Sequence, residues 1–157
     1  MTEQRLWAPW RIEYIKGPKE DECIFCERRD YVVFEGERCF VMLNAYPYTN
    51  GHVMVSPNEH VAKLEELDDE TLLELMTLTR QSLAAIREAY RPEGFNIGVN
   101  QGSVSGGSVE DHFHMHVVPR WGGDTSFMPV TGSVRVLPQG LDETYRELAA
   151  SWPSRTA

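Results

Sequence analysis

The sequence predicts an α+β fold, in which a mostly antiparallel five-stranded sheet carries one long helix and a short C-terminal helix. Five short apolar segments bounded by turn residues have the length and composition of strands. A longer segment between the third and fourth of them has apolar residues at helical spacing. The 157 residues fit a single domain, residues 1–157, with an N-terminal arm over residues 1–22 and a C-terminal extension over residues 131–157.

The first three strands precede the long helix. Residues 31–34 and 39–43 flank the charged, glycine-containing residues 35–38, which predicts a hairpin. Turn-forming residues then occupy positions 44–51, and a third strand follows over residues 53–55. Ser56 and Pro57 stop this strand.

The long helix follows residues 67–71, whose acidic side chains suit the first turn of a helix. Pro92 and Gly94 lie just beyond its end. Residues 95–99 and 113–118 predict the fourth and fifth strands, and residues 142–151 predict the short C-terminal helix. The apolar positions of the long helix are expected in the core: Leu72, Leu75, Met76, Leu83, Ile86 and Tyr90.

Composition and charge limit the possible partners. Hydrophobic residues make up 41% and charged residues 25%, as in ordinary globular proteins. The chain has no apolar run of about 18 residues and no apolar signal segment at its start, so we expect a cytoplasmic protein without a membrane partner. The formal net charge of −9 disfavours binding to a nucleic acid polymer. It does not exclude a small phosphate ligand, because backbone amides and a few local cations can hold one.

The histidines carry the clearest chemical signal. Three of the five occupy alternate positions in the predicted fifth strand, so they share one face, and the apolar residues between them face the core. Three protonated imidazoles on one face would repel each other, which predicts neutral or metal-bound rings. The histidines are His112, His114 and His116, and the core-facing residues are Phe113, Met115 and Val117.

Two kinds of site fit this pattern. The three imidazoles could bind one metal ion, or one imidazole could be a nucleophile whose neighbours bind and orient a phosphate. The glycine- and serine-rich loop over residues 101–111 favours the second, because Gly102, Gly106 and Gly107 permit an anion-binding arrangement of backbone amides. Asn100 can add an amide to this loop and Ser108 a hydroxyl.

Residues 112–118, with the sequence HFHMHVV, resemble the signature of the histidine-triad (HIT) family, His-φ-His-φ-His-φ-φ with φ hydrophobic. Residues 43–48 and 51–55 resemble the family's nucleoside-side strands, and residues 95–100 its strand before the phosphate loop. Other segments are similar to one branch of the family, the bacterial diadenosine tetraphosphate phosphorylases. These are residues 7–11, the pair Cys23 and Cys26, Asp111, and residues 119–124. The resemblance covers roughly residues 5–130 and implies a HIT-like fold.

The resemblance assigns roles by position. It implies that His114 attacks the α-phosphorus to form a nucleotidyl-histidine intermediate. It implies that His116 contacts the phosphate and assists the leaving group, and that His52, the family's fourth histidine, supports the triad. It places Asn44 at the ribose and the following residues at the phosphate: Asn100, Gly107, Ser108 and Val109.

The sequence departs from the pattern of many hydrolase members, which have Gly-Gln-Ser in the phosphate loop. Here Gly107 runs directly into Ser108, so a glutamine contact to the phosphates depends on whether Gln101 supplies it. Beyond the loop, Arg120 could meet a polyphosphate or pair with an acidic neighbour, and Trp121 could stack on an adenine or serve packing.

Cys23 and Cys26 form either half of a metal site or a redox pair. Zinc-containing relatives imply that His60 and His112 complete a Cys₂His₂ site, which would be closed and structural. The alternative is two thiols and an unrelated surface histidine. No organic cofactor is implied.

The leading hypothesis is phosphorolysis of diadenosine tetraphosphate to ADP and ATP, with inorganic phosphate as co-substrate. A dinucleoside polyphosphate hydrolase or a nucleoside phosphoramidase would use the same intermediate. A non-catalytic nucleotide-binding protein and a three-histidine metallohydrolase are the alternatives from other classes. The resemblance also implies a homodimer formed through the long helix and a strand.

Overall fold

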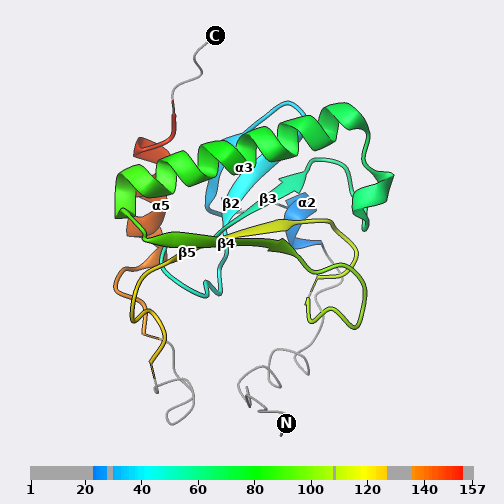
Figure 1. Cartoon of the computed structure of the whole chain (residues 1–157). Helices are drawn as coiled ribbons and strands as arrows, with labels where there is room; N and C mark the ends of the chain where they lie inside the picture. Colours follow the sequence, from blue (N-terminus) through cyan, green and yellow to red (C-terminus); the bar gives the residue numbers. More distant parts are fainter. Residues whose placement is uncertain (1–22, 28–29, 108, 127–135, 154–157) are drawn as a thin grey trace, which may run out of the picture.

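The computed structural model describes residues 23–27, 30–107, 109–126 and 136–153 (Figure 1). Five strands form one sheet, in the order β1-β2-β3-β5-β4, and every neighbouring pair is antiparallel. This confirms the α+β class and the five-stranded antiparallel sheet. The strands are β1 (Val32–Glu35), β2 (Cys39–Leu43), β3 (Val53–Pro57), β4 (Gly94–Val99) and β5 (Met115–Arg120).

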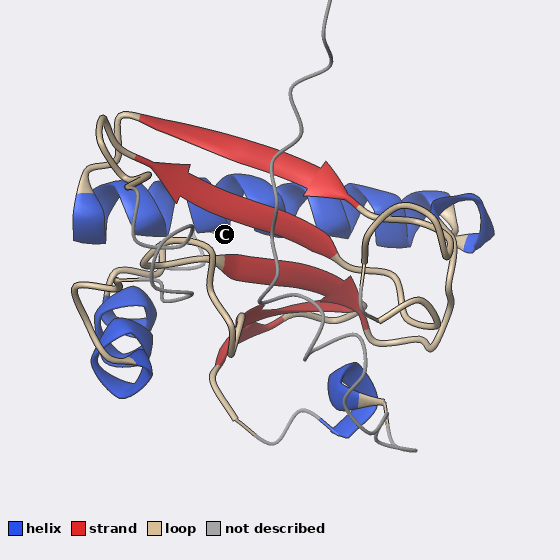
Figure 2. Ribbon diagram, turned by 90° about the horizontal axis from the view of Figure 1, so that it is seen from below, coloured by secondary structure: helices blue, strands red, loops and turns tan. Residues whose placement is uncertain are grey.

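The helices lie around this sheet. The long helix α3 (Asp69–Tyr90) crosses one face, and α5 (Leu141–Ala150) lies beside its C-terminal end and contacts β1 (Figures 1 and 2). Two short elements come in addition to the predicted ones, the helix α2 (Ile24–Glu27) and the 3₁₀ turn η1 (Leu64–Glu66). No helix in the described ranges is long and apolar enough to cross a membrane.

The ends of α3 follow from its capping residues. The side chain of Asp68 accepts a hydrogen bond from the Thr71 N–H at 2.7 Å, which satisfies one free donor of the first turn. The helix ends at Arg91, whose backbone is left-handed at φ 47°, and Pro92 follows. Met76, expected in the core, is 54% exposed because Leu75 and Leu78 occupy the buried side of the helix at this point.

Strand alternation divides the core between the two faces of the sheet. The α3 face holds Val41, Leu43, Val53 and Val55, and Phe113, Met115 and Val117 join them there as predicted. On the opposite face, α2 covers the sheet by burying Phe25 against the side chains of Phe40, Met42 and Met54. This second face is the one that carries the histidines.

The fifth strand begins later than predicted, at Met115 rather than Phe113. The pairing of β3 with β5 stops at Val55 and Met115, because Pro57 has no N–H to continue it. Other bonds hold the chain there. The Ser56 hydroxyl donates to the Phe113 carbonyl at 2.7 Å, and the Phe113 N–H donates to the Val61 carbonyl. His112 and His114 therefore precede the strand, and only His116 lies in it.

Candidate functional site

The five histidines form two neighbouring groups, one of three rings and one of two. His52 lies just before β3, and its ring Nε2 is 2.9 Å from Nδ1 of His116 on β5. The ring of His114 meets that of His116 edge to face, with centroids 4.9 Å apart. His112 points away from these rings, toward the cysteines. The structure thus brings together the three residues predicted to be catalytic and separates His112 from them.

The hydrogen bonds of His52 and His116 fix where their protons lie. The Tyr48 backbone N–H donates to Nδ1 of His52 at 3.1 Å, so Nδ1 is an acceptor and the proton of neutral His52 is on Nε2. That N–H donates to Nδ1 of His116. Neutral His116 therefore carries its own proton on Nε2, the nitrogen on the far side of its ring. This arrangement presents a hydrogen-bond donor beside His114.

His114 has the opposite arrangement. Its Nδ1 lies 2.9 Å from the backbone carbonyl of His112, and a carbonyl can only accept, so the proton is on Nδ1. The lone pair of neutral His114 is then on Nε2. A neutral imidazole with a held Nδ1–H and a lone pair on Nε2 is equipped to act as a nucleophile.

Burial keeps both rings neutral. His114 is 4% exposed, and this burial lowers its pKa from the ordinary value, with the hydrogen bond to the His112 carbonyl acting in the opposite direction. Burial and the neighbouring His114 lower the pKa of His116 to about 4. At neutral pH the pair therefore consists of one lone-pair donor and one N–H donor, without a charge on either ring.

Two aromatic side chains that the sequence had not assigned to the site hold these rings. Phe25 of α2 stacks on His114 with centroids 4.6 Å apart. The ring of Tyr48 stacks on that of His116 with centroids 5.8 Å apart, and its centroid lies 4.5 Å from that of the His52 ring. Phe25 lies between the two cysteines in the sequence, so its only sequence signal was its place in the predicted metal half-site.

The predicted phosphate loop follows β4. Gly102 and Gly106 both have φ of 86°, a conformation that favours glycine. A Cβ on Gly107 would lie 3.0 Å from the Cβ of Asn100, so glycine at position 107 lets the two ends of the loop approach each other. Val109 packs onto the aromatic and methionine cluster of the α2 face. Ser108 lies outside the described residues.

The side chain of Gln101, the candidate to replace the family's glutamine, is bonded to η1. Its side-chain carbonyl accepts the Leu64 N–H at 2.8 Å, and its amide donates to Glu65 at 2.9 Å. Both contacts tie the loop to η1. Gln101 therefore anchors the loop at its base.

Asn44 contacts His52 through a backbone hydrogen bond. Its N–H donates to the His52 carbonyl at 3.0 Å. Its side-chain carbonyl accepts the Tyr46 N–H at 2.9 Å, which forms a local turn after β2. The amide NH₂ end of Asn44 is the part of this side chain with the right chemistry to donate to a hydroxyl oxygen.

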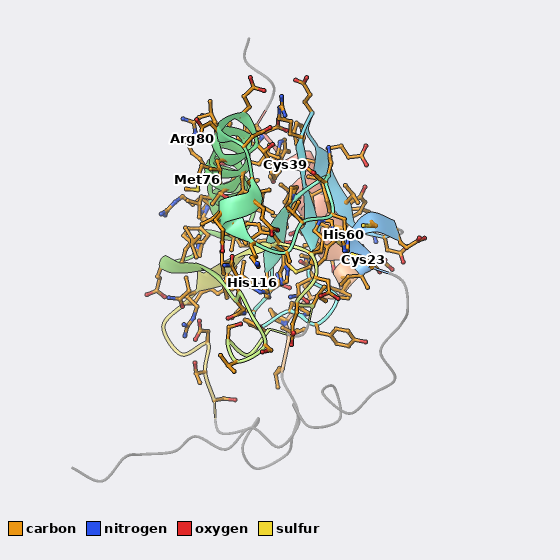
Figure 3. The ribbon with its side chains drawn as sticks, turned by 90° about the vertical axis from the view of Figure 1, so that its right-hand side faces the viewer. Cys23, Cys39, His60, Met76, Arg80 and His116 are labelled. Carbon is orange, nitrogen blue, oxygen red and sulfur yellow. The ribbon has the colours of Figure 1, made fainter. Side chains whose placement is uncertain are left out.

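The four residues predicted to bind zinc come together. One ligand atom from each of Cys23, Cys26, His60 and His112 lies within 4.8 Å of the others. Nδ1 of His112 is 3.3 Å from Sγ of Cys23 and 3.5 Å from Sγ of Cys26, and Nδ1 of His60 is 3.2 Å from Sγ of Cys26. A tetrahedral zinc site has ligand atoms roughly 3.3–3.8 Å apart, so this group fits the ion. Figure 3 shows Cys23 and His60 on the same side of the molecule.

The geometry decides between the two kinds of histidine site. Nε2 of His112 is 2.9 Å from the Pro57 carbonyl and must donate to it, which leaves Nδ1 to face the cysteines. Within the described residues, the one group of side chains spaced for a metal ion includes His112 and excludes His114 and His116. A metal ion held by all three alternate histidines does not fit this arrangement.

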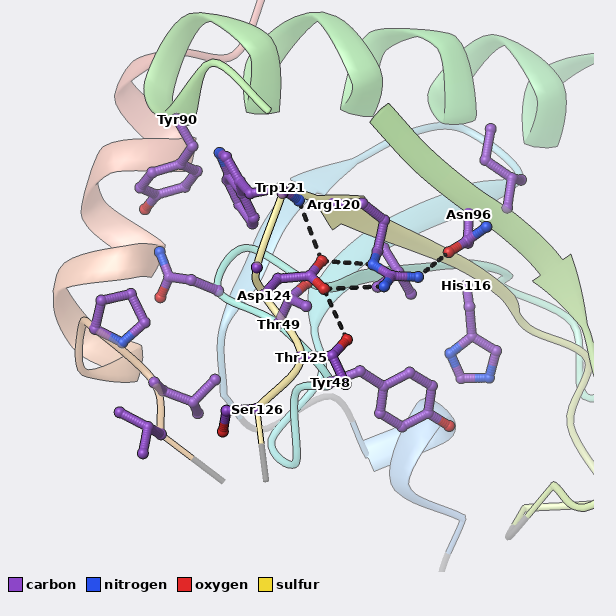
Figure 4. Close-up of a pocket in the computed structure, with 18 of the residues that line it drawn as sticks. Tyr48, Thr49, Tyr90, Asn96, His116, Arg120, Trp121, Asp124, Thr125 and Ser126 are labelled. Carbon is purple, nitrogen blue, oxygen red and sulfur yellow. Dashed lines mark hydrogen bonds and ion pairs between the residues drawn. The ribbon is translucent and has the colours of Figure 1, made fainter. Parts of the chain in front are cut away.

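A cavity of about 960 Å³ opens beside His116 and extends toward the end of α3 (Figure 4). Arg120 crosses it and pairs with Asp124, with Nε and Nη2 lying 2.5 and 2.9 Å from the carboxylate oxygens. A third nitrogen of Arg120 donates to Asn96 at 2.6 Å. Pairing keeps the pKa of Asp124 well below its usual range. Arg120 is thus held by an acidic neighbour, the second of the two roles considered for it.

Comparisons with known proteins agree with this geometry. A family model described as HIT domain matches residues 26–123. A protein of Mycobacterium tuberculosis named AP-4-A phosphorylase is 39% identical over 95% of this chain and 84% of its own length. An adenosine 5′-monophosphoramidase of Schizosaccharomyces pombe is 32% identical over 62% of this chain and 74% of its own. The crystal structure of a Zn-bound histidine triad family protein from Mycobacterium smegmatis, 30% identical, superposes with a TM-score of 0.66 over 82% of this chain and 91% of that one.

Proposed function

This chain belongs to the HIT domain family, and we propose that it cleaves diadenosine tetraphosphate by phosphorolysis, giving ADP and ATP through a nucleotide covalently bound to His114. The observation that carries the mechanism is the pair of opposite proton arrangements on adjacent rings. Nδ1 of His114 is held by the His112 carbonyl, whereas Nδ1 of His116 accepts from His52. A nucleophilic lone pair therefore lies next to an N–H donor.

In the first step, Nε2 of His114 attacks the α-phosphorus. The phosphorus–nitrogen bond forms as the bond to the bridging oxygen breaks, and the electron pair of that bond stays on the departing ATP. The Nε2–H of His116 donates to this oxygen as its charge develops, which stabilises the leaving group. We assign the non-bridging oxygens to the amides of the loop over residues 100–107, where Gly102 and Gly106 have positive φ.

In the second step, an oxygen of inorganic phosphate attacks the same phosphorus. The phosphorus–nitrogen bond breaks, its electron pair returns to Nε2 of His114, and ADP leaves. Water in place of phosphate would release AMP, so the choice of acceptor separates a phosphorylase from a hydrolase. The similarity to the enzyme from Mycobacterium tuberculosis, which extends over most of both chains, favours phosphate.

A nucleoside phosphoramidase is the second candidate. The similarity to the Schizosaccharomyces pombe phosphoramidase supports it, although that match covers a smaller share of this chain. The same two histidines would serve, with an amine as leaving group.

We further propose that Cys23, Cys26, His60 and His112 hold a structural zinc ion. Zinc would join α2 to the segments that follow β3 and precede β5, and four protein ligands would leave it no open position for catalysis.

A homodimer is the expected assembly. Large apolar side chains are exposed on the outer side of α3 and on the edge strand β4, where Leu73 is 70%, Met76 54% and Ile97 47% exposed. Met76 lies with Arg80 on this outer side in Figure 3. Burial of such a surface against a second copy would stabilise the assembly.

Product analysis tests the proposed reaction. The protein is incubated with diadenosine tetraphosphate, with and without inorganic phosphate, beside His114→Ala and a matched surface control, Glu143→Ala on α5. We expect ADP and ATP only when phosphate is present, loss of product with His114→Ala, and normal activity of the control. AMP and ATP in the absence of phosphate would identify a hydrolase, and product formation by His114→Ala would refute the mechanism.

A further inference from the structure

The cavity beside His116 is larger than the reacting groups require. Its volume is about 960 Å³, near the upper end of the range of about 300–1,000 Å³ for small-molecule sites. Tyr48 and His116 form one end and Tyr90 the other (Figure 4). Residues 136–138 also line the cavity, and the next residue, Gln139, contacts the Tyr90 hydroxyl. A phosphoramidate, whose leaving group is a small amine, would leave nearly all of this space to water.

The charge of the lining indicates what fits the far end. Among the described lining residues the cation is Arg120 and the anion is Asp124, and these two neutralise each other in a direct ion pair. The rest of the lining is aromatic, aliphatic, amide, hydroxyl or glycine, apart from His116 itself. Such walls suit an uncharged, planar, hydrogen-bonding group far better than a second run of phosphates.

The far wall comes from the segment that leads into α5. Val136, Leu137 and Pro138 line the cavity, and Val136 is 71% exposed although it is apolar. This wall has no strand or helix of its own. Its position depends on the residue that follows it, Gln139.

Gln139 is fastened to three other parts of the fold. Its side-chain carbonyl lies 2.8 Å from the hydroxyl of Tyr90 at the end of α3 and 2.9 Å from that of Thr144 in α5. The amide of Asn50, in the turn before His52, reaches the same oxygen at 3.3 Å. Thr144 and Asn50 are 2% and 8% exposed, so these bonds form where water competes little. Burial also raises the pKa of Tyr90 to about 12, which keeps its hydroxyl a donor.

We infer that this cavity binds the nucleoside at the leaving end of a dinucleoside polyphosphate. In this inference Gln139 is a positioning residue, which holds residues 136–138 in contact with that nucleoside. This inference rests on the proposed function and deepens it. The phosphate chain stays near His116 and the glycine loop, whereas the uncharged base and ribose occupy the far end. The C-terminal segment then selects dinucleotides over mononucleotide derivatives that share the same reacting phosphorus.

The test compares two substrates with one reacting centre, diadenosine tetraphosphate and adenosine 5′-phosphoramidate. Gln139→Ala and Val136→Asp are measured beside Glu143→Ala, an exposed position of α5. We expect each wall variant to raise KM for the dinucleotide by about five- to tenfold, the loss typical of one or two hydrogen bonds or apolar contacts, with kcat nearly unchanged. For the phosphoramidate, KM and kcat should change less than twofold in the same variants. Equal changes for both substrates, or none for the dinucleotide, would overturn the inference.

Binding to the inactive protein gives an independent readout. Titration calorimetry on His114→Ala compares diadenosine tetraphosphate with AMP, which lacks the leaving half. Adding Val136→Asp should weaken binding of the dinucleotide by about fivefold and leave AMP unaffected. An unchanged dinucleotide affinity would refute the inference even if the unaltered protein cleaved neither substrate, whereas that lack of cleavage by itself would refute only the proposed function.

Discussion

Substitution of His52 separates its two hydrogen bonds and so tests the proton arrangement of the site. The ring is fully buried, accepts the Tyr48 N–H at Nδ1 and donates from Nε2 to His116. The amide nitrogen of glutamine can reach the position of Nε2, and the amide carbonyl of asparagine that of Nδ1. His52→Gln therefore keeps a donor for His116, whereas His52→Asn keeps only the acceptor for Tyr48.

The expected loss follows from the acceptor left behind. In His52→Asn, Nδ1 of His116 is without the donor that holds the proton of His116 on Nε2. A buried unsatisfied acceptor costs about 1–3 kcal/mol, so the useful tautomer of His116 becomes roughly 5–150 times less populated. We expect kcat/KM to fall by about 10- to 100-fold in His52→Asn and to stay within about fivefold of the unaltered protein in His52→Gln.

Steady-state cleavage of diadenosine tetraphosphate in the presence of phosphate gives the rates, and nitrogen NMR of the labelled His116 ring reports its tautomer. The Nε2–H form should dominate in the unaltered protein and in His52→Gln but not in His52→Asn. Thermal unfolding of each variant shows whether the fold is intact. Equal losses in the two variants, with both folded, would refute the relay from His52 to His116.

Three further predictions concern the metal, the loop and pH. Metal analysis should find about one zinc per chain, and removal of zinc by a chelator, or Cys26→Ser, should lower the unfolding temperature by several degrees. An unchanged unfolding temperature of the metal-free protein would contradict the structural role. Gln101→Ala should raise KM for the dinucleotide by about threefold with kcat retained, and an unchanged KM would show that the anchor is dispensable. Because the pKa of His114 is lowered and that of His116 is about 4, kcat/KM should stay constant from about pH 8 to about pH 6. A fall of kcat/KM on the acid side with its midpoint at or above about pH 6.5 would instead show that the essential imidazole has an ordinary pKa.

The lowered pKa of His116 also has a consequence for stability. Between about pH 6.5 and 4 the unfolded chain binds the proton of this imidazole and the folded protein does not. The free energy of unfolding therefore falls as the pH falls through this window, and it is fully retained above it.

Local sequence pattern was sufficient to predict most of the fold. The helix α3 was predictable because its periodicity, its acidic first turn and Pro92 beyond its end all agree. Residues 39–43 and 53–55 lie in central strands, where apolar runs leave little ambiguity. The predicted stop at Ser56 and Pro57 was wrong, because both residues still pair with β2 and the strand β3 ends only at Pro57. Met76 was placed wrongly because helical spacing tolerates a wide apolar stripe, and only the packed structure shows which side faces the sheet.

The residues of the site that belong to the family's motifs could be predicted from the sequence. The contacts that depend on tertiary packing could not. The structure brings together His52, His114 and His116, the three histidines to which the resemblance assigns catalytic roles. Phe25 could not be assigned a place against His114, since the two residues are far apart in the chain and a single phenylalanine has no signature for stacking on an imidazole. The same holds for Gln101, whose anchoring partners follow from the position of η1.

His112, His114 and His116 occupy alternate positions of the chain, but only His116 lies in β5, and alternation does not explain why the surroundings of the three rings differ. The difference arises at Pro57, which ends the pairing of β3 with β5 and leaves its carbonyl to accept from His112. That bond turns Nδ1 of His112 to the cysteines, while the carbonyl of the same residue accepts from Nδ1 of His114. The proposed metal ligand His112 is therefore bonded directly to the proposed nucleophile His114, and an ion that fixes His112 would also fix the acceptor that directs the lone pair of His114. A structural metal can thus support catalysis without contacting the substrate.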